Sequence, residues 1–155
     1  MQINAENLVY IPILAQKDQM ERYIQNEFLE MIMSVYTEFY PRIGYHPPWI
    51  GYLALHDQVC VGVGGFKGPP KSNTIEIAYG TVPEYEGLGI SSQTCKFLTH
   101  LALTEDPGLK VTARTLMSES ASTNILRKNH FVLAGIVDDP EDGEVWEWVY
   151  QPEAA

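Results

Sequence analysis

A glycine-containing stretch offers the clearest chemistry in this sequence. Residues 83–93 read PEYEGLGISSQ, in which two glycines two positions apart precede an apolar pattern of helical period. Glycine has no Cβ to block a ligand, and the first amides of a helix have no partner within that helix. Such a turn is either an anion site, typically for a phosphate, or a plain tight turn. The residues predicted to hold the anion are Gly87, Leu88, Gly89, Ile90, Ser91 and Ser92.

The strand that precedes this turn contains an acidic residue. In TIEIAYGTV, residues 74–82, Glu76 lies between Ile75 and Ile77 in what reads as a central strand. An unpaired charge there is costly, so it indicates either a functional carboxylate or one satisfied on the open face of a sheet. A carboxylate beside a reacting amine can act as its base, directly or through water.

Aromatic residues gather in and around an irregular segment, YPRIGYHPPW, at residues 40–49. One function for them is to form a cage around a cationic amine, with Tyr36, His46 and Trp49 as the binding residues. The alternative is a lid packed on the core, which would also include Tyr40 and Tyr45.

The elements that must position these residues follow from periodicity and turn signals. We expect strands at 7–14, 49–55, 59–67, 74–82, 109–116, 131–137 and 144–150. We expect one helix or a pair of helices from Lys17 to Phe39, stopped by Pro41, and two further helices from Ile90 to just before Pro107 and at 120–129.

This order predicts an α+β protein of three layers, α/β/α, built as a single domain over residues 1–155. The strands before Ile90 form an antiparallel meander, and the strand–helix–strand that follows requires a right-handed parallel crossover. The result is a mixed, mostly antiparallel, splayed sheet of six to seven strands with helices on both faces. A ligand crevice is expected where parallel order begins, which is also where the GLG turn lies.

Composition narrows the class of protein. The chain has 155 residues and a formal charge of −10, which argues against nucleic-acid binding and favours basic partners. It has no apolar run long enough for a membrane span and no convincing secretion signal, so we expect a cytoplasmic protein. Cys60 and Cys95 lie in separate apolar segments and are expected to be reduced. The four histidines show no metal-ligand spacing, and DDPEDG fails as a calcium loop, so no metal is predicted.

Several separated segments together resemble one family. They are GFKGPP, TIEIAYGTVPEYEGLGISS, ASTNILRKNHF and DPEDGEVWEW, and they span residues 49–150. In this order and spacing they are similar to the GNAT superfamily of acyl-CoA N-acyltransferases, and most similar to its ribosomal-protein N-terminal acetyltransferase-like (Rim-type) branch. The resemblance implies that acetyl-CoA is the co-substrate, with its pyrophosphate on the GLG turn and its pantetheine arm paired with the end of the 74–82 strand.

The resemblance also implies a reaction and roles for residues. It implies direct transfer of an acetyl group to a primary amine, on a small molecule or at a protein N-terminus. Glu76 would be the base, and Tyr79 with a backbone N–H near Val82 would line the cleft and bind the carbonyl oxygen. Family members often place a tyrosine acid where this chain has Leu126, which leaves Ser122 as the candidate acid. The resemblance does not decide whether the protein forms a homodimer.

Two departures from the family pattern favour a rival interpretation. Glu86 takes the place of a cation or amide ahead of the first glycine, and Glu119 replaces an asparagine that often contacts the pantetheine arm. A carboxylate about 6 Å from a phosphate costs roughly 1–3 kcal/mol, or about 5- to 100-fold in affinity. The rival is a degenerate GNAT-fold module that binds acetyl-CoA weakly or not at all and serves as a ligand-binding or interaction domain.

Overall fold

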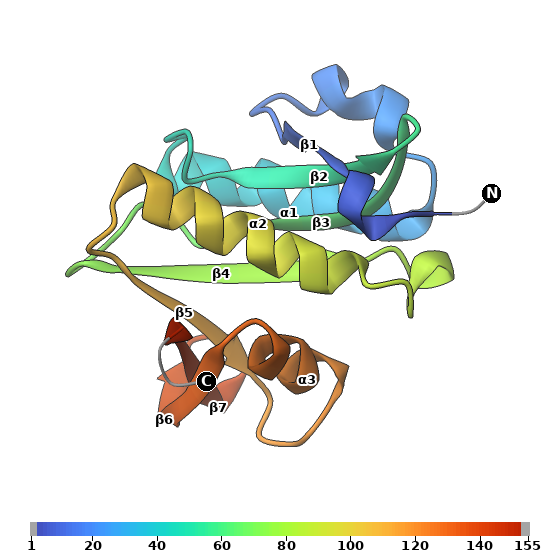
Figure 1. The fold of residues 1–155 in the computed structure, drawn as a ribbon. Helices are drawn as coiled ribbons and strands as arrows, with labels where there is room; N and C mark the ends of the chain where they lie inside the picture. The colour runs from blue at the N-terminus through green and yellow to red at the C-terminus, as the bar shows by residue number, and fades with distance from the viewer. Residues whose placement is uncertain (1–2, 153–155) are drawn as a thin grey trace.

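The computed structural model describes residues 3–152, whose strands form one mixed sheet (Figure 1). In sheet order the strands are β1 (Val9–Pro12), β2 (Gly51–His56), β3 (Val59–Phe66), β4 (Thr74–Thr81), β5 (Lys110–Thr115), β7 (Gly143–Tyr150) and β6 (Phe131–Asp139). Neighbouring strands are antiparallel except β4 and β5, which are parallel. The predicted meander, crossover and α+β class are therefore confirmed.

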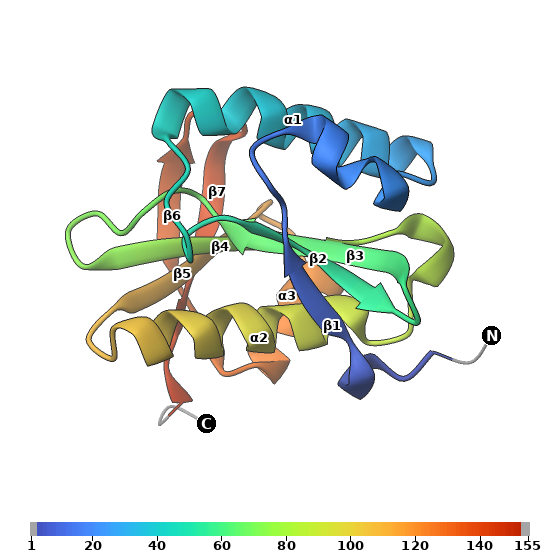
Figure 2. The same cartoon turned by 90° about the horizontal axis from the view of Figure 1, so that it is seen from above.

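The helices cover both faces of the sheet. Helix α1 (Glu27–Ile43) lies on one face, and α2 (Ile90–Glu105) and α3 (Ala121–Lys128) lie on the other (Figure 2). Three short 3₁₀ helices complete the described secondary structure, at Ala5–Asn7, Lys17–Tyr23 and Pro83–Tyr85. Within residues 3–152, no helix is both long and apolar enough to span a membrane.

The predicted helix at 17–39 forms as a pair and extends further than predicted. A 3₁₀ helix ends at Tyr23, and α1 begins after Asn26, whose side chain accepts a hydrogen bond from the Leu29 N–H. Pro41 does not stop α1, which continues to Ile43. Proline lacks one N–H and so removes only one helical hydrogen bond, here in the last turn of α1. Just before it, the buried Tyr40 hydroxyl donates to the Ile13 carbonyl and accepts from the Gly51 N–H, which anchors this end of the helix.

The other expected elements form with small shifts in their ends. The largest shift is at the N-terminus, where the predicted strand at 7–14 is reduced to β1, because a 3₁₀ turn occupies residues 5–7. His130 forms the turn just after α3, where it adopts the left-handed region at φ 69°. Cys60 and Cys95 are free and buried as expected, and burial raises the pKa of each thiol to about 12.

Small residues in β3 allow α2 to lie directly on the sheet. A Cβ built on Gly64 would overlap the Thr94 methyl group of α2 and would lie 3.1 Å from Leu98 Cδ1. On the other face, a Cβ on Gly65 would lie 2.6 Å from the Tyr36 hydroxyl of α1. These glycines therefore set the close approach of both helix layers.

This close approach predicts a loss of stability in Gly64→Ala. The added Cβ must push α2 away from the sheet, and we expect the free energy of unfolding to fall by about 1–3 kcal/mol. Urea denaturation measures this change. The control is Gly108→Ala at an exposed turn, where we expect a change within about 0.5 kcal/mol. Equal stability of the two variants would contradict the packing argument.

Candidate active site

The parallel pair β4 and β5 separates part-way along its length. Their pairing runs from Thr74 with Lys110 to Ile77 with Ala113 and then ends. Beyond that point β5 pairs only with β7, whereas β4 continues to Thr81 and pairs only with β3. Residues 78–81 thus have an open edge of about 13 Å toward β5, taking about 3.3 Å per residue. Ala78 is exposed there, in the middle of a sheet.

The alternation of backbone groups shows which amides face this opening. The Lys67 N–H donates to the Glu76 carbonyl, and the Val82 N–H donates to the Val61 carbonyl, both toward β3. Even-numbered residues of β4 therefore direct their backbone groups to β3, and Tyr79 and Thr81 direct theirs into the split. The Val82 N–H itself is therefore occupied by the Val61 carbonyl, so the expected donor near Val82 has to be a neighbouring amide. An amide of Tyr79 or Thr81 is the available donor for a carbonyl oxygen.

A cavity of about 530 Å³ opens from the split on the face that carries α2 and α3. Three segments line it: the end of β4 at residues 79–81, the turn from Glu86 to Ser92, and one side of α3. Apart from Leu88, the turn residues predicted to hold an anion all line this cavity. Leu88 is 47% exposed and lies outside it. The cleft is therefore open between β4 and α3 rather than filled by side chains.

The GLG turn has the conformation that an anion site requires. Gly87 and Gly89 have φ values of +82° and +83°, which L residues rarely adopt, and a Cβ on Gly87 would meet nothing within 4 Å. No side chain caps α2 at Gly89, so its first amides are free of side-chain partners. Ser91 is held by a 2.6 Å hydrogen bond between its hydroxyl and that of Thr81. The turn thus presents open backbone donors to the cavity.

The charges at this cavity are of both signs. Glu86 and Lys128 both line it and both are exposed, so an anion there meets one carboxylate and one ammonium group. Glu119 does not line the cavity: its carboxylate forms a two-bond ion pair with Arg127, including a 2.8 Å bond from Nη2 to Oε1. Hydrogen bonding from Arg127 lowers the pKa of Glu119. Of the two departures from the family pattern, only Glu86 faces the site.

Ser122 and Tyr79 both line this cavity. The helix cap of α3 is Ser120, which forms a reciprocal capping pair with Thr123, so Ser122 is not needed as a cap. The Tyr79 hydroxyl is buried, and burial raises the pKa of this phenol, whereas the neighbouring Ser122 side chain lowers it. Leu126, at the position where relatives often have tyrosine, is fully buried in the core.

Glu76 lies on the opposite face of β4, in a separate cavity of about 200 Å³. Its carboxylate is 3.7 Å from Lys67 Nζ and 3.7 Å from Arg114 Nε. Arg114 also pairs with Asp139, at 3.1 Å, and with Glu147, at 3.6 Å. Burial raises the pKa of Glu76 above its usual value, although Lys67 and Arg114 act in the opposite direction. A carboxylate with a raised pKa is suited to accept a proton.

Sequence reasoning missed the groups around Glu76, as well as Lys128. Arg114 had a detectable signal, because it is a charged residue at an alternate position of the LKVTARTL strand. Asp139 and Asp142, which also line this cavity, belong to the DDPEDG turn, which sequence reasoning considered only as a calcium loop. Nothing local in the sequence indicates that this turn folds back beside β4.

The aromatic residues predicted to bind the acceptor line neither of these two cavities within residues 3–152. Tyr36 packs on Gly51 and Gly65, and burial raises its pKa to about 12. Trp49 stacks edge-on against Phe66 with ring centroids 5.1 Å apart. His46 is exposed. This arrangement fits the alternative of aromatic residues packed on the core.

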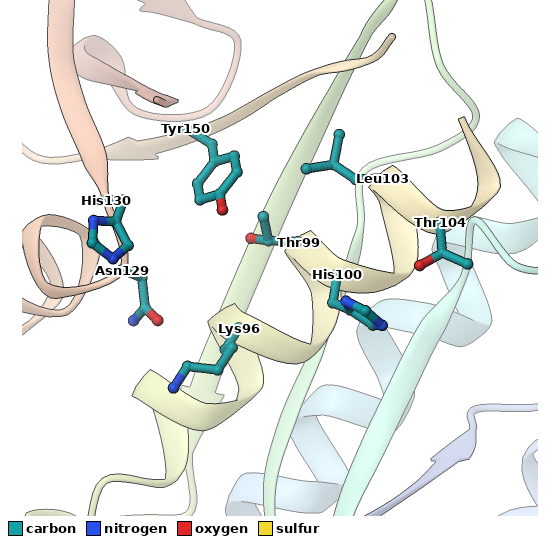
Figure 3. A pocket seen from close by; sticks show the side chains of 8 residues that line it. All are labelled: Lys96, Thr99, His100, Leu103, Thr104, Asn129, His130 and Tyr150. Atoms are coloured by element: carbon teal, nitrogen blue, oxygen red, sulfur yellow. The ribbon is translucent and has the colours of Figure 1, made fainter. Parts of the chain in front are cut away.

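A further cavity, of about 500 Å³, lies between α2 and the segments that carry Asn129, His130 and Tyr150 (Figure 3). Lys96, His100 and His130 give it a basic lining. Asn129 also lines it and donates to the Ser92 hydroxyl at 3.1 Å, which places this residue between the basic cavity and the GLG turn. The basic cavity does not include the open edge of β4, so it is not the candidate site for chemistry at the split.

Comparisons with known proteins agree with this geometry. The acetyltransferase (GNAT) domain family matches residues 3–132. No curated protein sequence matches the chain. Among solved structures, one similar chain is the acetyltransferase that modifies the N-terminal serine of ribosomal protein L7/L12 from Salmonella typhimurium. It has 20% identity and a TM-score of 0.59, covering 78% of this chain and 73% of that one.

Two other solved structures were determined with coenzyme A. RimL, a ribosomal L7/L12 α-N-protein acetyltransferase, has 19% identity and a TM-score of 0.60, covering 86% of this chain and 77% of that one. The aminoglycoside acetyltransferase AAC(6')-Ib has 15% identity and a TM-score of 0.70, covering 96% of each chain. These likenesses confirm the fold. Because the family match spans most of the sequence, the chain belongs to the GNAT family of acetyltransferases.

Proposed function

We propose that this protein transfers an acetyl group from acetyl-CoA directly to a primary amine. The observation that carries the proposal is the pair of cavities on opposite faces of the β4–β5 split. One is lined by the GLG turn together with Tyr79 and Ser122, and the other is lined by Glu76. They are separated by one step of β4, because Ala78 lines the second and Tyr79 lines the first. A donor and an acceptor that enter from opposite faces meet there without a covalent enzyme intermediate.

The residues of the first cavity fit acetyl-CoA. Backbone amides at the start of α2 suit its pyrophosphate, and the open edge at residues 78–81 can pair with the amides of its pantetheine arm. Acetyl-CoA supplies an activated thioester. The chain supplies position: the edge of β4 orients the arm, and an amide of Tyr79 or Thr81 can hold the carbonyl oxygen.

The residues of the second cavity fit the acceptor. Lys67 and Arg114 carry two positive charges, and Glu76, Asp139 and Asp142 carry three negative ones, so the lining has a net negative charge. Such a lining favours a cationic amine and then helps to remove its proton through Glu76. Solved structures of similar fold are described as acting on a protein N-terminus or as holding an aminoglycoside, and both of these carry amines.

The rival function, an interaction module without turnover, has one supporting observation, namely that Glu86 lines the phosphate side of the first cavity. Titration calorimetry with acetyl-CoA separates the two. We expect stoichiometric binding in the micromolar range, followed by release of CoA thiol with at least one member of a panel of amines and basic peptides. Absence of heat and of thermal stabilisation at millimolar acetyl-CoA would favour the interaction module.

Glu86→Arg is predicted to strengthen binding of acetyl-CoA. Reversing this charge beside the GLG turn should lower Kd by about 10- to 100-fold at low salt, with a smaller gain as salt screens the charges. Calorimetry at two ionic strengths measures both effects. The matched control is Glu84→Arg, which changes the net charge equally in the same loop but does not line the cavity. An equal gain in the control would show that only the overall charge of the protein matters.

A further inference from the structure

Strand β6 is an edge of the sheet, and apolar side chains lie exposed along it. In the part of the chain that the structure describes, β6 is the last strand in sheet order and pairs with β7 alone. It is nine residues long, and within it Leu133 is 43% exposed and Ile136 is 58% exposed. An edge strand of this length, with apolar side chains, is a template for pairing with another strand.

The alternation of the backbone shows which residues of β6 direct their N–H and C=O groups away from β7. The His130 carbonyl accepts a hydrogen bond from the residue that follows β7, so Leu133, three positions on, directs its groups outward. Ala134 is a bulge, because the register with β7 shifts at this residue. A bulge moves the alternation by one position, so Ile136 is the next residue whose backbone groups point outward.

Leu133 and Ile136 also share one face of the sheet. Leu133 lies opposite Trp148 and Ile136 lies opposite Trp146, and these two tryptophans contact each other edge-on, with ring centroids 6.2 Å apart. A groove of about 320 Å³ lies beside Leu133, and Phe131 and Trp148 contribute to its apolar lining. The same edge therefore offers a projecting apolar side chain, Ile136, and a groove that can receive one.

The two ends of β6 carry opposite charges. Lys128 lies just before the strand, whereas Asp138 and Glu141 lie at its far end, and all three are exposed. A second copy of β6 that lies antiparallel, with the twofold axis at residues 134–135, meets each end with the opposite charge. A parallel copy would bring like charges together instead. The edge is therefore complementary to itself in the antiparallel direction only.

We propose that two copies of this chain associate by antiparallel pairing of their β6 strands, which joins the two sheets into one. Leu133 of each copy lies opposite Ile136 of the other, so each Ile136 enters the groove beside the opposing Leu133. A bulge often protects an edge strand from such pairing. Here the twofold axis passes through the bulge, so both copies bend at the same place and remain matched on either side of it. The inference is independent of the proposed acetyl transfer.

Sedimentation velocity over a range of protein concentrations tests the proposal. At about 150 mM salt, which screens the repulsion between two acidic chains, we expect a dimer with a Kd in the micromolar range. Ile136→Lys should raise that Kd at least about 10-fold, because the symmetry places the new charge in the interface twice. The matched control is Val35→Lys on α1, which adds the same charge at a residue that is 54% exposed and should leave the Kd unchanged. Circular dichroism checks that both variants are folded.

Cross-linking tests the register. Directly opposite residues of a hydrogen-bonded antiparallel pair have Cα atoms about 5.5 Å apart, which is within the range for a disulfide. Leu133→Cys combined with Ile136→Cys should therefore give a covalent dimer on oxidation with copper and air, whereas Leu133→Cys alone should not. The native Cys60 and Cys95 are buried and do not interfere.

Two results would overturn the proposal. One is a wild-type protein that stays monomeric up to about 200 μM, well above a micromolar Kd. The other is a dimer that persists in Ile136→Lys and that the paired cysteines do not cross-link, because such a dimer uses another face.

Discussion

Replacing Glu76 by glutamine is expected to lower kcat/KM by about 10²- to 10⁴-fold, because under the proposed role of Glu76 as the base the amide cannot accept a proton from the attacking amine. The change is nearly isosteric. A second carboxylate allows the loss of the base to be distinguished from the loss of a charge partner of Arg114. Glu147 contacts the same Arg114 at 3.6 Å but does not line the cavity. Glu147→Gln is therefore the matched control and should retain most of the activity. Steady-state release of CoA thiol measures both variants.

The pH profile provides a second measurement on Glu76. Burial raises its pKa above the usual value of 4.5, and the base must be deprotonated to act. Activity of the wild type should therefore fall as pH decreases through the raised pKa, giving an acid limb above the usual carboxylate range. In Glu76→Gln this limb should disappear from the residual rate. An unchanged limb, or full activity in the variant, would assign Glu76 to the alternative of a carboxylate satisfied by Lys67 and Arg114.

Gly89→Glu should abolish measurable cofactor binding, with a loss of about 100-fold or more. A carboxylate about 5 Å from a pyrophosphate costs about 3 kcal/mol at the effective dielectric of a protein surface, and it adds to the effect of Glu86. The side chain would also project from the position where backbone amides must approach the ligand. Calorimetry with acetyl-CoA measures the loss.

Backbone strain must be separated from charge in this experiment. Gly89 has φ +83°, so any L residue there is strained, by about 1–2 kcal/mol. Gly89→Ala carries the same strain without the charge and should lose far less affinity than Gly89→Glu. If the two variants bind acetyl-CoA equally, the anion does not lie on this turn, and the assignment of the first cavity is wrong.

Sequence patterns predicted the elements well because each depends on local rules. Alternation of apolar residues identified β3 and β4, and the GLG turn followed from glycine and a helical period. Pro41 was misjudged because in the last turn of α1 it removes only one helical hydrogen bond, and because Tyr40 anchors this end of the helix by two hydrogen bonds to segments far away in the chain. Local propensity does not include such bonds.

Sequence reasoning identified only part of the candidate site, because the rest also depends on contacts between distant segments. Arg114 meets Asp139 across 25 residues, through the pairing of β5 with β7 and of β7 with β6. The register of those pairs is not encoded in the turn that contains Asp139. The direction of the Val82 N–H likewise depends on its partner Val61 in β3. Strand pairing, rather than residue type, decided which predicted groups face the cleft.

The two cavities are lined by different parts of the chain, so each cavity can change in evolution without the other. All residues around the GLG cavity come from between 79 and 128, whereas those around Glu76 begin at Lys67 and extend to the hairpin at Val145. Among residues 3–152, helix α1 and the segments before β3 line neither cavity. Under the proposed function, exchange of the hairpin tip would therefore alter the side that takes the amine and leave the side that holds acetyl-CoA intact. A short insertion or replacement in this hairpin would then change the accepted amine without rebuilding the acetyl-CoA side.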